Sequence, residues 1–241
     1  MGQALVKQEQ LFAGRDGSDR PRTQQHHEDP QIGVNARGDL RFRALMGADA
    51  WGLLPAAIRQ RFSKRCAEKA TAIYRGHLTT VRISPLGHAL ANILRLVGAP
   101  LPVSTDDDVP SVVTVTEDVR HGGQVWTRLY ANRQGFPQVI HSAKRFSGPT
   151  GLEEHLGFGL SMALELEPRA DALLFHSAGY VWRLAGLEIR LPRWLEPGQL
   201  LVEHRDCADQ HGPGAFIFAL TLHHPWFDEL VHQAGIYRES A

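Results

Sequence analysis

The stretch LEEHLGFGLSMALELE, residues 152–167, alternates apolar and polar side chains for longer than any other part of this 241-residue chain. The period of two predicts a β-strand with one buried face and one face in water. Sheets with one solvated face are typically antiparallel. The apolar face is expected to hold Leu152, Leu156, Phe158, Leu160, Met162, Leu164 and Leu166.

The same period continues on both sides of this stretch, over residues 111–238. About eight or nine strand-like runs are separated there by Gly, Pro, Asn and Asp. An open sheet of that many strands would leave long exposed edges, so closure or strong curvature is expected. The sequence therefore predicts a mainly β (α+β) fold with an antiparallel, barrel-like or strongly curved sheet.

The first half of the chain has a different pattern. Residues 1–38 carry few apolar side chains and are expected to form a disordered arm before a single domain at 39–241. A helix is predicted from Asp39 and another near Pro55, where apolar residues recur at helical spacing. With the helix described next, residues 39–110 form a helical part of two or three helices, interrupted by one short strand in YRGHLTTVRI, residues 74–83.

The clearest helix lies in SPLGHALANILRLVGAP, residues 84–100, with Ser84 as the N-cap and Gly98 and Pro100 as its stop. Leu86, Leu90, Ile93, Leu94 and Val97 share one face, while Arg95 is the only full charge on the other. Such a helix either packs into the core, covers a cavity or lies against a membrane. The sequence leaves these readings open.

Composition excludes several classes of function. Basic and acidic residues number 26 each, so no net charge attracts nucleic acid. Cys66 and Cys207 form no C-x-x-C pair, and no stretch is long and apolar enough for a membrane span. We therefore expect a soluble, cytoplasmic protein.

Cofactor and metal motifs are also missing from the pattern. There is no phosphate-binding loop and no H-E-x-x-H motif. In HHPWFDELVH, residues 223–232, Pro225 and Trp226 predict a turn that separates the potential ligands. No metal site and no cofactor are predicted.

Two neighbouring strands carry charge among apolar residues. In GQVWTRLYANRQGFPQVIHSAKRF, residues 123–146, Trp126, Arg128 and Tyr130 share one face. Either Arg128 reaches solvent with its stem over the aromatic rings, or this face lines a cavity that is partly charged. Glu154 favours the cavity, because it falls on the apolar face of 152–167 and an unpaired buried carboxylate would cost several kcal/mol. Arg128 is its predicted partner.

Glu203 and Arg205 add a second carboxylate and cation within a strand pattern. Buried pairs of this kind either stabilise a barrel or bind a ligand, and the residues alone do not separate the two roles.

The order of short motifs resembles the bacterial domain-of-unknown-function family 4166 over about residues 40–238. The shared features are LLPAAIRQRF, YRG, SPLGHALANILRLVGAPLP, Trp126-x-Arg128, a strand ending in Ser142, GLEEHLG, Leu191-Pro192, Glu203, Phe216-x-Phe218 and His224-Pro225. The family has no assigned activity. Related domains occur fused to reductase or dehydrogenase-like modules, and the resemblance therefore implies an accessory domain that handles a metabolite or lipid-like substrate.

The functional hypothesis is a domain that binds an amphipathic or lipid-like small molecule in a β-lined cavity and serves a reductase as an accessory domain. Small barrels either fill their interior with side chains or enclose one ligand. The candidate site residues are Trp126, Arg128, Tyr130, Glu154, Phe158, Trp182 and Glu203. Two alternatives stay open: a cofactor-free enzyme that uses Glu154 or Glu203 as acid or base, and a scaffold that docks a reductase or dehydrogenase-like protein through a sheet edge or helix 85–97.

Overall fold

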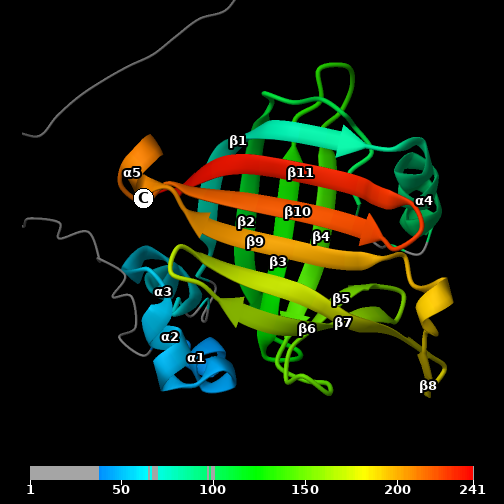
Figure 1. The fold of residues 1–241 in the computed structure, drawn as a ribbon, viewed down its shortest axis with the longest axis horizontal. Helices are drawn as coiled ribbons and strands as arrows, with labels where there is room; N and C mark the ends of the chain where they lie inside the picture. The colour runs from blue at the N-terminus through cyan, green and yellow to red at the C-terminus, as the bar shows by residue number, and fades with distance from the viewer. Residues whose placement is uncertain (1–37, 65, 67–69, 97, 99–100, 241) are drawn as a thin grey trace, which may run out of the picture. The chain divides into compact units, whose positions relative to one another are not determined.

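A computed structural model describes residues 38–64, 66, 70–96, 98 and 101–240 of the chain. Its centre is an antiparallel sheet of eleven strands in the order β6-β5-β4-β3-β2-β1-β11-β10-β9-β7-β8. A further pairing of β6 with β7 closes ten of these strands into a barrel, and β8 is an extra strand on β7. The predicted antiparallel barrel is therefore confirmed (Figure 1).

The strands alternate between inward and outward side chains along most of their length. They are β1 (Ala72–Ile83), β2 (Pro110–Asp118), β3 (Gly123–Tyr130), β4 (Gln138–Arg145), β5 (Glu153–Gly157), β6 (Leu160–Pro168), β7 (Ala172–Leu184), β8 (Leu187–Arg190), β9 (Gln199–Asp206), β10 (Phe216–His224) and β11 (Asp228–Glu239).

The stretch 152–167 contains two strands instead of the single strand expected. β5 and β6 form a hairpin that turns at Phe158 and Gly159, whose φ angles are 44° and 79°. A Cβ on Gly159 would lie 1.9 Å from the carbonyl oxygen of Arg183, so the turn requires glycine there. Glu154 and Met162 face each other across the hairpin and point to the same side. The alternation of apolar and polar residues therefore continues through the turn without a break. For this reason the period of two could not reveal the turn.

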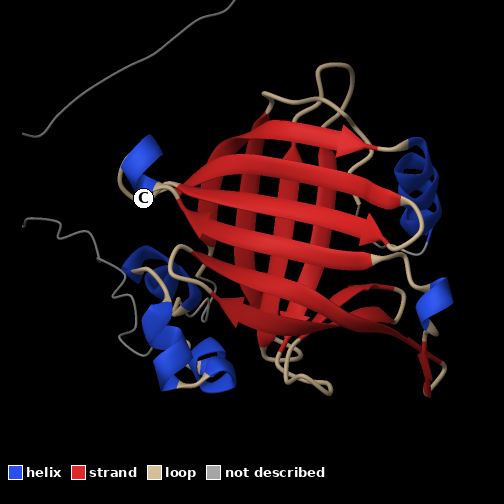
Figure 2. Ribbon diagram, in the orientation of Figure 1, coloured by secondary structure: helices blue, strands red, loops and turns tan. Residues whose placement is uncertain are grey.

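The helices are short. They are α1 (Arg41–Met46), α2 (Ala48–Leu53), α3 (Ala56–Phe62), α4 (Pro85–Leu96), the 3-10 helix η1 (Arg193–Leu195) and α5 (Ala208–His211). Figure 1 shows α1–α3 near one end of the barrel and α4 and β8 at the other, and Figure 2 shows the strands between them. None of the helices in the described ranges is long and apolar enough to cross a membrane.

In the first half of the chain, the strand predicted at residues 74–83 is confirmed as β1. It has twelve residues and belongs to the barrel, where it pairs with both β2 and β11. The helix α2 was not expected from the sequence, because its six residues are too few to establish a period. The predicted disordered arm lies outside the described residues, except for Gly38.

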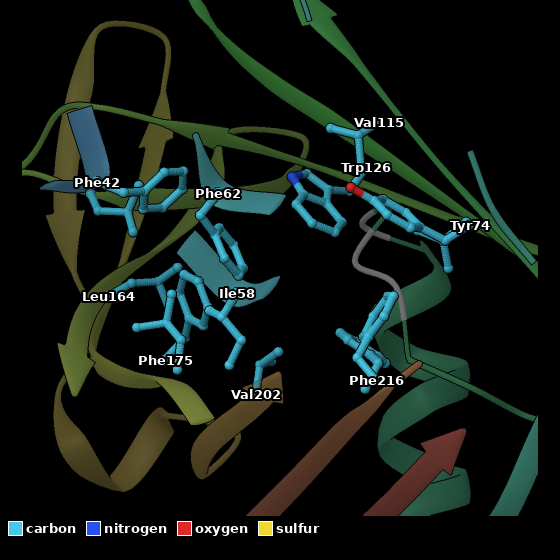
Figure 3. Packing of buried hydrophobic residues seen from close by; sticks show 14 of the residues in the cluster. Phe42, Ile58, Phe62, Tyr74, Val115, Trp126, Leu164, Phe175, Val202 and Phe216 are labelled. Atoms are coloured by element: carbon cyan, nitrogen blue, oxygen red, sulfur yellow. The ribbon is translucent and has the colours of Figure 1, made fainter. Parts of the chain in front are cut away.

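Aromatic side chains fill the end of the barrel beside α1–α3. Phe42 of α1 and Phe62 of α3 pack edge to face, with ring centroids 5.2 Å apart, and both rings contact Phe175 of β7 (Figure 3). Ile58 of α3 is fully buried in the same cluster. These helices therefore close one end of the barrel with core side chains.

Helix α4 lies against the other end through small residues. A Cβ on Gly87 would lie 2.1 Å from the carbonyl oxygen of Leu230, and Ala91 is fully buried beside Leu222 of β10. As predicted, Ser84 caps the helix, since its Oγ accepts a hydrogen bond of 3.0 Å from the Gly87 N–H. Leu90 and Leu94 pack partly against the same cluster, whereas Leu86 and Ile93 stay exposed on another face of α4. Val97, expected on that face, lies outside the described residues.

Candidate functional site

A group of charged side chains points into the barrel from β3, β4 and β5. Arg128, Ser142, Lys144 and Glu154 are all buried, and we call them the buried charge cluster. The strand register brings them together. Lys144 lies directly opposite Glu154, and Ser142 lies opposite Trp126, which precedes Arg128 by two residues on the same face of β3. The predicted partnership of Arg128 with Glu154 is therefore found, with Lys144 as an additional member.

Within the buried charge cluster, Glu154 is the acceptor for both neighbours on β4. Lys144 Nζ lies 2.9 Å from Glu154 Oε2, and Ser142 Oγ donates a hydrogen bond of 2.6 Å to Glu154 Oε1. Arg128 is less closely engaged. Its Nη1 donates to Ser142 Oγ at 3.2 Å, while its Nη2 lies 3.6 Å from Glu154 Oε1.

The cluster holds its carboxylate ionised. Burial alone would raise the pKa of Glu154, but the positive charges of Lys144 and Arg128, with the hydrogen bonds from Ser142 and Lys144, lower it to about 2. Burial, opposed by Glu154, lowers the pKa of Lys144 from its ordinary value. The cluster contains two basic side chains and one acidic one, so charge is not balanced within it.

The outer face of the same strands is paired separately. Arg145 points away from the interior, and its Nε lies 2.8 Å from Asp118 Oδ2. The mixed character of residues 123–146 is thus explained by two sets of ion pairs on opposite faces of the sheet. Of the two readings offered by the sequence, the one in which Arg128 reaches solvent is wrong, because its side chain is only 7% exposed.

A buried histidine lies in the aromatic core on the α3 side. His204 of β9 packs against Phe62, Phe175 and Phe218, with ring centroids 5.0, 5.7 and 5.2 Å away. Burial, with the positive charges of Arg61, Lys144 and Arg128, lowers the pKa of His204 well below its ordinary value. Burial therefore favours the neutral form of the ring, which packs among aromatic side chains.

The barrel interior next to the cluster is largely filled. A small cavity of about 50 Å³ remains, and its lining includes Arg128, Glu154, Met162 and Tyr180. That volume is enough for a few water molecules. The β-lined cavity expected from the sequence is therefore small in this part of the described interior.

A much larger apolar pocket lies at the end of the barrel. It measures about 490 Å³ and is lined by side chains of α4, the β7–β8 hairpin, η1 and the β10–β11 turn. We call it the α4 pocket, and its lining includes Leu90, Ile93, Leu94, Trp182, Ile189 and Leu195. Leu94 and Pro197 also line the small cavity, so the two hollows adjoin. Four of the large apolar side chains of α4, those of Leu86, Leu90, Ile93 and Leu94, thus line a pocket.

The seven residues predicted for the site fall into different places. Trp126, Arg128 and Glu154 are inside the barrel, and Tyr130 is buried on the same face of β3 with Ile140 as a neighbour. Trp182 lines the α4 pocket instead of the barrel interior. Its Nε1 donates a hydrogen bond of 2.8 Å to the Phe158 carbonyl.

Two of the predicted residues lie outside both the barrel interior and the α4 pocket. Phe158 is 73% exposed, because it occupies the turn between β5 and β6 and not a strand. Glu203 lies on the outer face of β9, where Arg205 Nε is 2.6 Å from its Oε1. The inward side chains of that strand are Val202 and His204, which belong to the core. Glu203, a candidate for the β-lined cavity, therefore lies outside the barrel interior.

Sequence reasoning missed Lys144 and the α4 pocket. Lys144 follows Ile140 and Ser142 at a spacing of two, so the alternation itself carried the signal that it points inward. Reading it required the register of β4 against β5, which puts Lys144 opposite Glu154. The α4 pocket is built from four separate segments, and no local pattern brings them together.

Comparison with known proteins supports the expected family. A family model described as a domain of unknown function, DUF4166, matches residues 54–236. The match begins just before α3 and ends within β11, and so it takes in strands from every part of the barrel. No curated protein and no solved structure gives a significant match.

Proposed function

We propose that this chain, which belongs to the DUF4166 family, binds an amphipathic small molecule whose apolar part occupies the α4 pocket. The observation that carries the proposal is a pocket of about 490 Å³ with apolar walls that adjoins a buried polar cluster. Pockets for small molecules are typically of about 300–1,000 Å³, mostly apolar, and contain a few polar groups.

The energetics of the α4 pocket support an occupant. Ile93 is 61% exposed, and Ile189 and Leu195 are about half exposed around the same hollow. Each Å² of apolar surface removed from water contributes roughly 25 cal/mol of favourable free energy. An apolar chain that fills the pocket would remove both its own surface and that of the pocket wall from water. Contiguous apolar surface of this kind commonly marks a binding site.

An acid–base role for Glu154 is less well supported. A general acid or base works best with a pKa near the operating pH, whereas Lys144 and Arg128 hold that of Glu154 at about 2. Glu203 lies on the outer face in an ion pair with Arg205. Neither carboxylate therefore offers an observation that favours catalysis over binding.

Partner docking also has less support than small-molecule binding. Leu86, Leu90, Ile93 and Leu94 of the proposed docking helix, 85–97, line the α4 pocket. Closure of the barrel leaves β8, a strand of four residues, as the free edge of the described sheet. Association with a reductase or dehydrogenase-like protein stays a prediction.

Two measurements test the proposed function. Native mass spectrometry of the freshly purified full chain should detect a stoichiometric amphipathic adduct, which organic extraction then identifies. If purification removes the occupant, titration with the uncharged fluorescent probe N-phenyl-1-naphthylamine should give one saturable site and a blue-shifted emission. A clean protein mass together with no saturable probe binding would reject the proposal.

A further inference from the structure

We infer that the bound molecule carries an anionic headgroup of the carboxylate class and that this headgroup binds Arg128 in the small cavity. The inference rests on the proposed function and names the chemistry of its ligand. It begins with the charge balance of the interior. Arg128 and Lys144 share the single carboxylate of Glu154, and no other acidic side chain belongs to the buried charge cluster. One further negative charge would balance it.

The hydrogen bonds identify Arg128 as the cation whose donors are not all used. Glu154 already accepts from Lys144 at 2.9 Å and from Ser142 at 2.6 Å, one bond on each oxygen. The distance of 3.6 Å from Arg128 Nη2 to Glu154 Oε1 is too long for a good hydrogen bond. Arg128 Nε is buried and has no hydrogen-bond partner among the described residues. Buried donors without partners are rare, and such a donor often marks the place of an absent group.

The position of this guanidinium fits a ligand that enters from the α4 pocket. Arg128 lines the small cavity, which adjoins the α4 pocket at Leu94 and Pro197. A headgroup in the small cavity would therefore continue directly into an apolar chain in the larger hollow. The arrangement has a polar end inside the barrel and an apolar end beside α4.

The size of the small cavity selects the headgroup. About 50 Å³ accommodates a group of a few atoms, such as a carboxylate, but not a sugar or a phosphodiester with its substituents. A carboxylate also matches a guanidinium in geometry, because two parallel N–H donors can meet its two oxygens. The headgroup class follows from charge, geometry and volume together.

Displacement of N-phenyl-1-naphthylamine by two probes of equal chain length tests the inference. Dodecanoate and dodecan-1-ol differ in the headgroup, and the titration is done above the pKa of the dodecanoate carboxyl. Dodecanoate should displace the dye from the wild-type chain at a concentration about ten-fold or more below that of dodecan-1-ol. Equal displacement by the two would overturn the inference while leaving the proposed function in place.

Variants locate the headgroup. Arg128→Met should reduce the preference for dodecanoate to near unity while dodecan-1-ol binds as before. Arg145→Met is the matched control, since Arg145 lies on β4 but faces outward to Asp118, and it should keep the preference. Arg128→Lys should retain part of it. A preference that survives in Arg128→Met would overturn the inference, and failure of the wild-type chain to bind any of the three probes would reject the proposed function itself.

Discussion

Lys144 and Glu154 are cross-strand partners in the β4–β5 ladder, and they form an ion pair inside the barrel, with 2.9 Å between Lys144 Nζ and Glu154 Oε2. Both side chains are buried. The pair cannot rely on solvent to stabilise either charge, so the stability of the barrel depends on which members of the buried charge cluster are present. Arg128 adds a second positive charge to the same carboxylate.

The first prediction concerns the unequal cost of removing charges. Glu154→Gln leaves two buried cations without an anion and should lower the free energy of unfolding by about 3–5 kcal/mol. Arg128→Met leaves the Lys144–Glu154 ion pair, which has no net charge, and should lower the free energy of unfolding by about 1 kcal/mol or less. Urea unfolding followed by circular dichroism measures both values. Equal losses would mean that the surplus charge of Arg128 is balanced by something else.

The second prediction concerns pH. The pKa of Glu154 is about 2 in the folded barrel, against 4.5 as its ordinary value. As pH falls below about 4.5 the unfolded chain takes up the proton first, so stability from Glu154 is complete above that value and is lost progressively down to about pH 2. Because the side chain is fully buried, the loss should be about 3 kcal/mol.

Carboxyl ¹³C NMR of glutamate-labelled protein measures this pKa directly. The Glu154 signal should remain that of a carboxylate down to about pH 3 in the wild-type chain, and Arg128→Met should shift its titration upward because one stabilising cation is gone. A midpoint near 4.5 in the wild-type chain would show that the cluster does not hold the charge as described.

The third prediction uses two exposed positions on α4. Ile93 lines the α4 pocket, whereas Leu96, which is 81% exposed, is not among its lining residues. Ile93→Glu should weaken binding of N-phenyl-1-naphthylamine about ten-fold or more, because a carboxylate at an apolar wall must be desolvated by the occupant. Leu96→Glu adds the same charge to the same helix and should change binding by less than about two-fold. Similar effects of the two substitutions would place the dye elsewhere.

The fourth prediction concerns the β5–β6 turn. Gly159 and Gly186 both have a positive φ, of 79° and 83°, but only at Gly159 would a Cβ collide with backbone, at the Arg183 carbonyl. Gly186→Ala should therefore cost about 1 kcal/mol of stability, from backbone strain alone. Gly159→Ala should cost at least about 2 kcal/mol. Thermal unfolding of the two variants compares them, and equal costs would contradict the close contact of the turn with β7.

The sequence was most informative where one side chain in two is buried. Alternation in residues 111–238 predicted the antiparallel barrel, because the pleat of a strand fixes which residues share a face. The same rule failed at 152–167, where Glu154 and Met162 keep the same phase across a hairpin. It also did not decide which face of β9 points inward, where His204 is buried and the candidate residue Glu203 is not.

The candidate site was predictable only in part. Arg128 and Glu154 were recognisable because each is a charge in phase with an apolar face, and a buried charge requires a partner. Lys144 depends on strand register, and the α4 pocket depends on how α4, β8 and η1 meet in space. Those relationships are tertiary, and local periodicity contains no information about them.

A crystal structure of the full chain with dodecanoate would test the central claim most directly. We predict density for the acyl chain in the α4 pocket beside Leu90 and Ile93, with the carboxylate within hydrogen-bond distance of the Arg128 guanidinium. An acyl chain bound elsewhere on the protein, or an α4 pocket that stays unoccupied at saturating dodecanoate, would contradict it.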